Sequence, residues 1–280
     1  MSEDLFARKP PEPAARIGIG GWVYAPWRDN FYPPKLVQRR ELEFASRHLT
    51  SLEINGTYYG AQKPATYAKW RNETPEGFLF SLKAPGRITT RRDLAGAGGE
   101  IDAFIFGGLE ELGDRLGPIL WQFEHGIRFD AEAFAAFLER LPHELDGRRL
   151  RHVIEVRDES FLCEHYFELM RQRGLPSVFT DSEKYPSFAD LSGDFVYARL
   201  MRSRSALPTG YTEAELDVWA GRIRGWRSGE APTDLPLQQP AAKPQPREVF
   251  VYFISAAKER NPAAAMALAQ RLGWSPAPWK

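Results

Sequence analysis

Polar side chains of the kinds that transfer protons and bind charged groups stand at regular spacing in three apolar stretches. On a strand, side chains two residues apart point to the same face of the sheet. Three pairs have this spacing: Glu53 with Asn55, Ser81 with Lys83, and Glu155 with Arg157. Burial and neighbouring charges set the pKa of such groups, which is how proteins prepare them for acid–base catalysis. The pattern indicates Glu53, Glu155 and Lys83 as candidate catalytic residues.

The elements that must position these pairs are strands that alternate with amphipathic helices. The predicted strands are residues 16–22, 51–55, 78–84, 118–123, 152–157, 177–181, 195–200 and 248–254. The predicted helices are residues 39–49, 64–73, 130–141, 164–174, 212–226 and 261–273. This alternation is typical of parallel βαβ units, and eight strands is the number in a (β/α)8 barrel.

One unit of the predicted barrel is incomplete. Residues 182–194, between the sixth and seventh strands, are too short and too broken for a full helix. We therefore predict an α/β fold, an irregular TIM-type (β/α)7–8 barrel in a single domain over residues 16–280, with an open doubly wound sheet as the alternative. Residues 1–15 are expected to be a mobile lead into the domain. The Pro-rich residues 228–248 are expected to form a mobile surface loop at the N-terminal end of the barrel.

In a barrel of this type the ligand site lies at the C-terminal ends of the strands. The residues expected to bind a ligand there are Trp22, Tyr24, Asn55, Tyr59, Gln122, Arg157, Asp181 and Arg199. The alternative is that the charged residues form ion pairs that close the barrel mouth, because a buried unpaired charge is expensive. The number of polar strand ends and aromatic side chains favours a ligand site.

The sequence assigns no metal or cofactor. A single cysteine, Cys163, excludes a disulfide framework and a cysteine metal cluster. The five histidines have no HExxH spacing, which disfavours a histidine-rich zinc or iron centre. A Mg²⁺ or Mn²⁺ site built from Glu53, Glu155 and Asp181 stays open as an alternative.

Composition and charge argue against several classes of protein, although a local basic patch leaves nucleic acid possible as a partner. Lysine plus arginine number 37, as do aspartate plus glutamate, so the net charge does not favour nucleic acid or an anionic membrane as a partner. The N-terminal residues contain no apolar signal-peptide core, and no apolar run approaches the length of a membrane-spanning helix. We expect a cytoplasmic protein with no membrane partner and leave its oligomeric state open.

Longer stretches of the sequence resemble a known family. Segments such as IGIGGWVYAPWRDNFYP, ELEFASRHLTSLEINGTYYG, WRNETPEGFLFSLKAP, LGPILWQF and VYFISAAKERNPAAAMALAQRL occur in the order typical of the DUF72 (YecE-like) family, over residues 16–273. The resemblance implies an irregular TIM-type barrel and no established reaction. The polar and aromatic positions that it implies are Trp22, Tyr24, Trp27, Glu53, Asn55, Thr57, Tyr59, Lys83, Gln122, Glu155, Arg157 and Arg199.

The chain departs from the family pattern at several strand ends. Thr90, Asp158 and Met201 stand where the family usually carries histidine. Residues 252–256 read YFISA where the family usually reads YFNND. A reaction that used one of those histidines as acid or base would be altered or lost in this chain.

Three functions are consistent with these residues. The first is an enzyme, or the relic of one, that acts on a small anionic ligand such as a phosphorylated sugar or nucleotide, whose charge Lys83, Arg157 and Arg199 would neutralise. Glu53 or Glu155 would supply the acid or base, and together they would make the carboxylate pair of a glycosidase. The alternatives are a binding module for a nucleotide or single-stranded nucleic acid, and a partner-binding scaffold that has lost its chemistry. We rank the enzyme or relic enzyme first.

Overall fold

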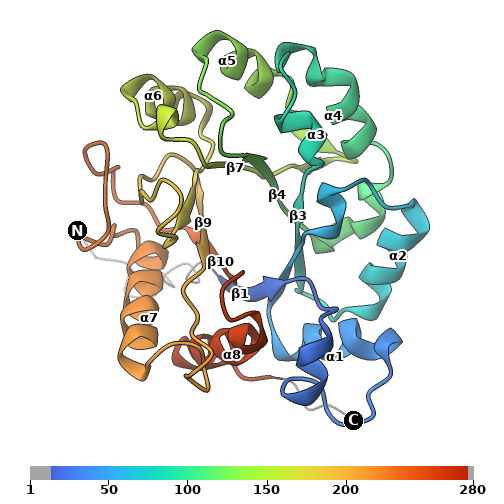
Figure 1. Cartoon of the computed structure of the whole chain (residues 1–280). Helices are drawn as coiled ribbons and strands as arrows, with labels where there is room; N and C mark the ends of the chain where they lie inside the picture. The colour runs from blue at the N-terminus through green and yellow to red at the C-terminus, as the bar shows by residue number, and fades with distance from the viewer. Residues whose placement is uncertain (1–13, 277–280) are drawn as a thin grey trace, which may run out of the picture.

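Eight parallel strands form the wall of a barrel in the computed structural model, which describes residues 14–276 (Figure 1). They are β1 (Ala15–Gly20), β2 (Ser51–Ile54), β3 (Leu79–Lys83), β4 (Leu116–Phe123), β7 (His152–Val156), β8 (Val178–Thr180), β9 (Phe195–Leu200) and β10 (Glu248–Phe253). They pair in the order β7-β4-β3-β2-β1-β10-β9-β8. Between β7 and β8 the amide of Ile154 donates to the carbonyl of Pro176 at 3.1 Å, which nearly closes the ring. The predicted barrel is confirmed, and the open doubly wound sheet is excluded.

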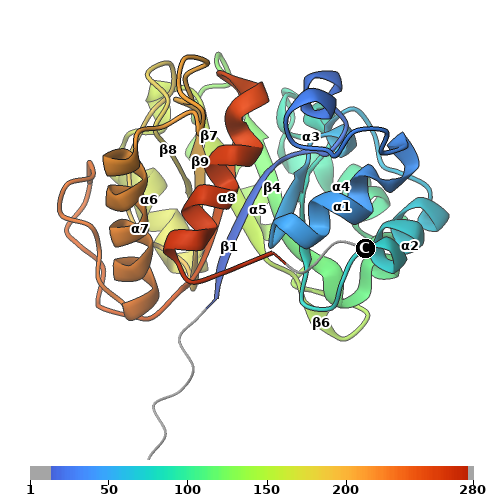
Figure 2. The same cartoon turned by 90° about the horizontal axis from the view of Figure 1, so that it is seen from below.

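Helices surround the barrel on its outside (Figures 1 and 2). They are α1 (Glu41–His48), α2 (Pro64–Glu73), α3 (Gly86–Thr89), α4 (Gly98–Ile105), α5 (Ala131–Glu139), α6 (Glu164–Arg173), α7 (Glu213–Ser228) and α8 (Asn261–Arg271). The sequence did not predict α3, α4 or the short antiparallel hairpin of β5 (Glu144–Leu145) and β6 (Arg148–Arg149). Two glycines begin α4. Because glycine is a weak helix former, the sequence of α4 gives little indication of a helix. No helix of the described residues is long and apolar enough to cross a membrane.

Side chains along each strand point alternately outward, into the core between the strands and the helices, and inward, into the interior of the barrel. In β1, Ile17 and Ile19 belong to the core that packs against the helices, whereas Gly18 places no side chain inside. A Cβ at Gly18 would lie 2.1 Å from the carbonyl oxygen of Ser51 and 3.2 Å from the ring of Tyr252. The space inside is filled by large aromatic rings from the neighbouring strands β10 and β9, among them Tyr252 and Tyr197, which form the floor beneath the polar strand ends.

The incomplete unit between β8 and β9 contains no helix, as predicted. The Pro-rich segment after α7 lies along it instead. The amide of Ala189 donates to the carbonyl of Pro236 at 2.8 Å, and the carboxylate of Asp190 accepts the amides of Gln238 and Gln239, each at 2.9 Å. The Pro-rich segment therefore covers part of the barrel side that lacks a helix.

Two expectations about irregular segments have different outcomes. The Pro-rich segment begins and ends at the N-terminal end of the barrel, as expected, where the amide of Gln245 donates to the carbonyl of Gly229, but Leu235 and Pro236 in its middle part line a groove at the C-terminal end. Its docking on residues 189–190 explains the difference, and its mobility stays a prediction. Of the expected N-terminal lead, residues 1–13 lie outside the described residues, and Ala15 already belongs to β1.

Candidate functional site

The polar strand ends meet in a buried ion-pair network at the mouth of the barrel. Arg199 from β9 lies between the carboxylates of Glu53 from β2 and Glu155 from β7, and none of the three is more than 2% exposed. Nη2 of Arg199 lies 3.0 Å from Oε1 of Glu53, and Nη1 lies 2.6 Å from Oε2 of Glu155. Tyr197 donates a hydrogen bond of 2.7 Å to Glu53, and Gln122 donates one to Glu155. The centre of the barrel thus satisfies its own charges, as the ion-pair alternative predicted.

Two arginines keep the carboxylate of Glu155 ionised. Arg157 adds a contact of 3.2 Å to that of Arg199. Burial acts to raise the pKa of Glu155, but the two guanidinium groups outweigh it and lower this pKa to about 2. Such a carboxylate is a weak proton acceptor near neutral pH. The geometry therefore suits Glu155 to orienting the arginines better than to transferring a proton.

Lys83, at the end of β3, differs from the other charges of the mouth. Its Nζ lies 3.7 Å from the centroid of the Tyr58 ring and 4.0 Å from Oε1 of Glu124. The side chain is buried, and burial, followed by the charge of Arg199, lowers its pKa to about 8. An appreciable fraction of the amine is therefore neutral near physiological pH, the form that accepts protons and attacks carbonyl carbon.

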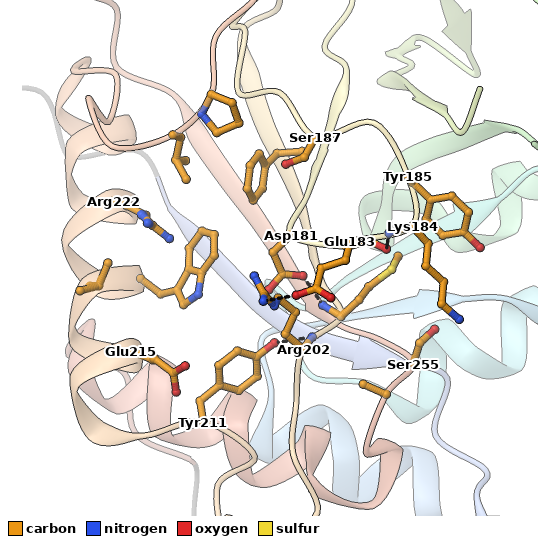
Figure 3. A pocket seen from close by; sticks show the side chains of 18 of the residues that line it. Asp181, Glu183, Lys184, Tyr185, Ser187, Arg202, Tyr211, Glu215, Arg222 and Ser255 are labelled. Atoms are coloured by element: carbon orange, nitrogen blue, oxygen red, sulfur yellow. Dashed lines mark hydrogen bonds and ion pairs between the residues drawn. The ribbon is translucent and has the colours of Figure 1, made fainter. Parts of the chain in front are cut away.

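A groove of about 1150 Å³ opens beside this network, at the C-terminal ends of β8, β9 and β10 (Figure 3). It lies on the side where no helix connects β8 to β9. One wall is α7, and the other is the start of the irregular segment after β8. The charged residues that line it are Asp181, Glu183, Lys184, Arg202, Arg204, Glu215 and Arg222. The missing helix is thus what gives the barrel an open site.

Asp181, directly after β8, is the titratable group at the base of this groove (Figure 3). Its Oδ1 accepts the amide of Met201 at 2.6 Å. The hydroxyl of Tyr211, which accepts the amide of Arg202 at 3.0 Å, hydrogen-bonds to the same carboxyl group. Burial nevertheless raises the pKa of Asp181 to about 6. The carboxyl group therefore changes protonation near neutral pH in contact with an open cavity.

The arginines at the rim of the groove are held only by exposed carboxylates. Arg202 pairs with Glu183, and Arg204 pairs with Glu215, and all four side chains are exposed. Exposed pairs of this kind contribute about 0–1 kcal/mol to stability. Lys184 forms no ion pair with any described residue. An incoming anion can therefore replace these carboxylates with little loss of stability.

The structure brings six predicted residues together and places a seventh nearby. The six at the mouth are Glu53, Lys83, Gln122, Glu155, Arg157 and Arg199. Asp181 lies in the groove, apart from the ion-pair network. The groove and the ion-pair network are nevertheless adjacent. The guanidinium of Arg157, which belongs to the network, lies 4.3 Å from the ring centroid of Tyr185, which lines the groove.

Two of the predicted ligand residues point away from the mouth. The ring of Trp22 packs edge-on against Trp70 of α2, with centroids 5.2 Å apart, in the layer between barrel and helices. Gly21, at a φ of 74°, breaks the strand alternation just before it. Tyr59 is 87% exposed and contacts the ring of Tyr58. The structure gives neither side chain a contact with the ion-pair network.

The other two predicted ligand residues lie at the rim. Tyr24 packs edge-on against Trp27, and the ammonium of Lys258 lies 4.6 Å from the Tyr24 ring centroid. Asn55 lies against β1, where its Nδ2 is 2.9 Å from the position that a Cβ on Gly20 would take. Both are close enough to the strand ends for their ligand role to stay a prediction.

The sequence analysis missed several residues that complete the site. Glu124 follows Gln122 by two residues and Tyr197 precedes Arg199 by two, so the same-face rule for strands would have found both. Glu124 accepts from Arg157 at 3.0 Å and from the hydroxyl of Tyr58 at 3.1 Å. Lys184 and Tyr211 come from irregular segments, for which sequence spacing gives no signal.

The three positions that depart from the family's histidines have separate roles here. Thr90 donates to the carbonyl of Gly86 at 2.9 Å at the end of α3. Asp158 accepts the amides of Ser160 and Gly126, both at 3.1 Å, and so holds a turn. Met201 lines the groove beside Asp181. One of the three substitutions therefore changes the groove itself.

No group of three or more histidine, cysteine, aspartate or glutamate side chains that could hold a metal ion occurs among the described residues. The three carboxylates considered for Mg²⁺ or Mn²⁺ do not form such a group. Glu53 and Glu155 are committed to Arg199, and Asp181 lies in the groove.

Solved structures share this barrel. A DUF72 family protein (TM1631) from Thermotoga maritima superposes with a TM-score of 0.70 at 20% identity, covering 93% of this chain and 100% of the other. A DUF72 family protein (EF0366) from Enterococcus faecalis also gives 0.70, at 19% identity, covering 95% and 99%. At these identities the likeness shows the fold alone.

Relatives are also found by sequence. The chain is 27% identical to "UPF0759 protein YunF" of Bacillus subtilis over 165 residues, 54% of each chain. It is 27% identical to "UPF0759 protein YecE" of Escherichia coli K12 over 173 residues, 59% of this chain and 58% of the relative. The match thus spans little more than half the length of these curated relatives. Residues 16–280 match the family described as "Protein of unknown function DUF72", and the chain belongs to that family.

Proposed function

We propose that the chain is an enzyme that acts on a small anionic substrate, a phosphorylated sugar or a nucleotide, bound in the groove at the C-terminal ends of β8, β9 and β10. The observation that carries the proposal is Asp181, whose buried carboxyl group has a pKa of about 6 and lines that groove. A pKa near the working pH is what a general acid or base needs. A perturbed acid in an open cavity is a reasoned candidate for an active site.

The anionic charge of the substrate follows from the cations at the rim. Lys184 has no ion pair among the described residues, and Arg202 has only an exposed one. Replacing an exposed carboxylate by a substrate phosphate loses little and forms charge-assisted hydrogen bonds. The buried Arg199 cannot serve in this way, because its guanidinium is already enclosed by two carboxylates.

Lys83 is the second titratable group of the proposal; it lies at the mouth beside the groove and contributes a positive charge near the anionic substrate. Its pKa of about 8 lies above that of Asp181, at about 6, so the two groups differ in protonation between these values. With Asp181 as base and the positive charge of Lys83 favouring the anionic substrate, the rate rises as the pH passes 6 and falls as it passes 8. In this account Glu53 and Glu155 are positioning residues that hold Arg199.

A barrel without catalysis is the second candidate, and one observation favours it. The ion-pair network at the mouth is closed, and the family's histidines are replaced by Thr90, Asp158 and Met201. Such a scaffold would bind partners or ligands without a bell-shaped dependence of any rate on pH.

The test begins with the thermal stability of the purified chain in the presence of phosphorylated sugars and nucleotides. A ligand that binds the folded state raises the melting temperature. We expect at least one such ligand, with its shift reduced in the double variant Lys184→Ala/Arg202→Ala. Phosphorus NMR of that ligand then follows turnover by wild type, Asp181→Asn and Lys83→Met between pH 5 and pH 9.

The matched control is Arg149→Ala with Lys69→Ala, which removes an exposed arginine that is paired with an exposed carboxylate and an exposed lysine, neither of which lines the groove. We expect this control to keep both the thermal shift and the turnover. Turnover that survives Asp181→Asn at all pH values overturns the role of Asp181. Binding without any turnover of the ligand overturns the enzyme in favour of the scaffold.

A further inference from the structure

The two ends of the groove differ in chemistry, and this difference identifies its ligand more closely; the inference rests on the proposed function. We propose that the ligand is a mononucleotide, with its phosphate at Lys184 and Arg202 and its planar base stacked on Arg222. Figure 3 shows Arg222 beside α7 at one end of the groove, Lys184 and Tyr185 at the other, and Arg202 between them.

Arg222 is held as a flat platform. Its guanidinium lies 4.3 Å from the ring centroid of Trp219, one turn earlier on α7. Its Nη2 and Nε lie 2.7 and 3.1 Å from Oδ2 of Asp234 in the Pro-rich segment. One face and one edge of the guanidinium are thus fixed, and the residue still lines the groove. The planar guanidinium of arginine is a surface on which nucleobases stack.

Apart from the carboxylate of Asp234, the neighbours of Arg222 include apolar side chains in the wall of the groove. Val218 of α7 is 49% exposed, and Leu235 and Pro236 of the Pro-rich segment complete the wall. Sugar hydroxyl groups need hydrogen-bond partners that such a wall does not offer. The edge and face of a base can lie against it. An apolar wall at one end and cations at the other therefore fit a nucleotide better than a phosphorylated sugar.

The size of the groove agrees with this assignment. At about 1150 Å³ it lies slightly above the range of about 300–1,000 Å³ usual for small-molecule sites, and a sugar phosphate would leave the end at Arg222 empty. A planar ring there would lie against the guanidinium of Arg222, which itself makes a cation–π contact with Trp219. Base stacking on aromatic and arginine surfaces is tolerant of base identity, so we expect little discrimination among the four bases.

The experiment measures binding of adenosine monophosphate and of ribose phosphate by titration calorimetry. We expect the nucleotide to bind at least about ten-fold more tightly to wild type, as one stacked base would give. In Arg222→Lys, which keeps a charge opposite Asp234 but lacks the planar group, the preference should fall to about two-fold or less. The affinity for ribose phosphate should not change.

Two control variants separate stacking from charge. Arg224→Lys, exposed on the same helix, should leave both affinities as in wild type. Lys184→Ala/Arg202→Ala should weaken both ligands by the same factor and keep their ratio. Equal affinities of the two ligands in wild type, or a preference that survives Arg222→Lys, overturns the mononucleotide assignment. An oligothymidylate that binds far more tightly than any mononucleotide also overturns it, in favour of a nucleic-acid strand.

Separate measurements of binding and of turnover distinguish this inference from the proposed function. Turnover of a phosphorylated sugar, with no gain from a base, overturns the mononucleotide and leaves the enzyme standing. A base preference that depends on Arg222, with no turnover at any pH, supports the mononucleotide site and overturns the enzyme.

Discussion

At the centre of the barrel Arg199 is enclosed with the two carboxylates that neutralise it, whereas in the adjacent groove Arg202 and Arg204 meet their carboxylates in solvent. Both regions pair cations with anions at strand ends. In the first, separating a pair would leave an unpaired charge in the interior, which is strongly unfavourable. In the second, water replaces a lost partner, so the pairs contribute little.

This difference between buried and exposed ion pairs indicates where a ligand can bind. A buried, saturated network has few donors or acceptors left for a substrate and acts as a rigid floor. A groove with weakly held cations and a carboxyl group near its pKa can exchange partners and protons. Polar strand ends alone therefore do not identify a ligand site, because burial decides whether a charged group can exchange its partner.

The largest effect should come from removing the central cation. In Arg199→Met the carboxylates of Glu53 and Glu155 lose their buried partner. We expect the free energy of unfolding to fall by about 3–5 kcal/mol, as for other broken buried pairs. Urea denaturation measures it.

This variant has two controls, one in the exposed groove and one in the buried network. Arg204→Met, which removes an exposed arginine, should change stability by less than about 1 kcal/mol. The triple variant Glu53→Gln/Glu155→Gln/Arg199→Met should recover most of the loss, because it leaves no unpaired charge. A loss below about 1 kcal/mol in Arg199→Met would contradict a buried network.

Asp181 should show the next largest effect, in the dependence of stability on pH. Burial raises the pKa of its carboxyl group from 3.8 to about 6, so the folded state binds the proton more tightly than the unfolded state. The stabilisation is complete below pH 4 and is lost as the pH rises to about 6. A shift of this size corresponds to roughly 3 kcal/mol. Wild type should lose that amount relative to Asp181→Asn over this range.

Asp234 is the control, because its effect on stability should depend on pH in the opposite direction. Its hydrogen bond to Arg222 lowers the pKa of this exposed carboxyl group. Wild type should therefore lose a little stability relative to Asp234→Asn as the pH falls, and urea denaturation at a series of pH values shows both trends. A flat difference between wild type and Asp181→Asn would show that the carboxyl group titrates normally.

Lys83 should weaken the folded state slightly at neutral pH. Burial lowers the pKa of its amine from 10.5 to about 8, so the charged form is disfavoured on folding. Lys83→Met should be more stable than wild type by about 1–2 kcal/mol at pH 7, after allowance for lost contacts with Tyr58. The gain should shrink as the pH rises from 8 to 10.5, because the penalty in wild type disappears.

Lys69 is exposed, so Lys69→Met is the control and should change the free energy of unfolding little. Thermal and urea unfolding measure both variants. A Lys83→Met protein that is less stable than wild type at pH 7 would make the amine a structural part of the network.

The smallest predicted effect concerns the backbone at the rim of the groove. Ser255 and Ala256, after β10, have φ values of 60° and 48°, in the left-handed region that disfavours alanine. Asn and Asp, which stand at these two positions in the family pattern described above, tolerate this conformation better. Ala256→Asn should raise stability by about 0.5–1 kcal/mol, whereas Ala241→Asn, at an exposed position without positive φ, should not. An unchanged melting temperature in Ala256→Asn would contradict strain at this rim.

Much of the barrel could be predicted from sequence because its signals are local. Each strand is a short apolar run, and the same-face rule placed Glu53, Lys83, Glu155 and Arg157 at one mouth. The incomplete unit at 182–194 was also visible, since it is too short for a helix. These features depend only on neighbouring residues.

The groove could not be predicted in the same way. It depends on the docking of Pro236 beside Ala189, which lies far away in the sequence. The raised pKa of Asp181 depends on burial by that surrounding structure. Trp22 was placed at the mouth because the strand was extended past Gly21, where the chain in fact turns. Long-range packing and turns therefore decided what the local pattern left open.

The most direct test of the account is a carbon NMR titration of the side-chain carboxyl groups, with and without adenosine monophosphate, assigned with Asp181→Asn. We predict a carboxyl signal from Asp181 that titrates near pH 6 and shifts when the nucleotide is added, while those of Glu53 and Glu155 do not respond to the nucleotide. An Asp181 signal that titrates near pH 4 and ignores every anionic ligand would contradict a proton-transfer site in the groove.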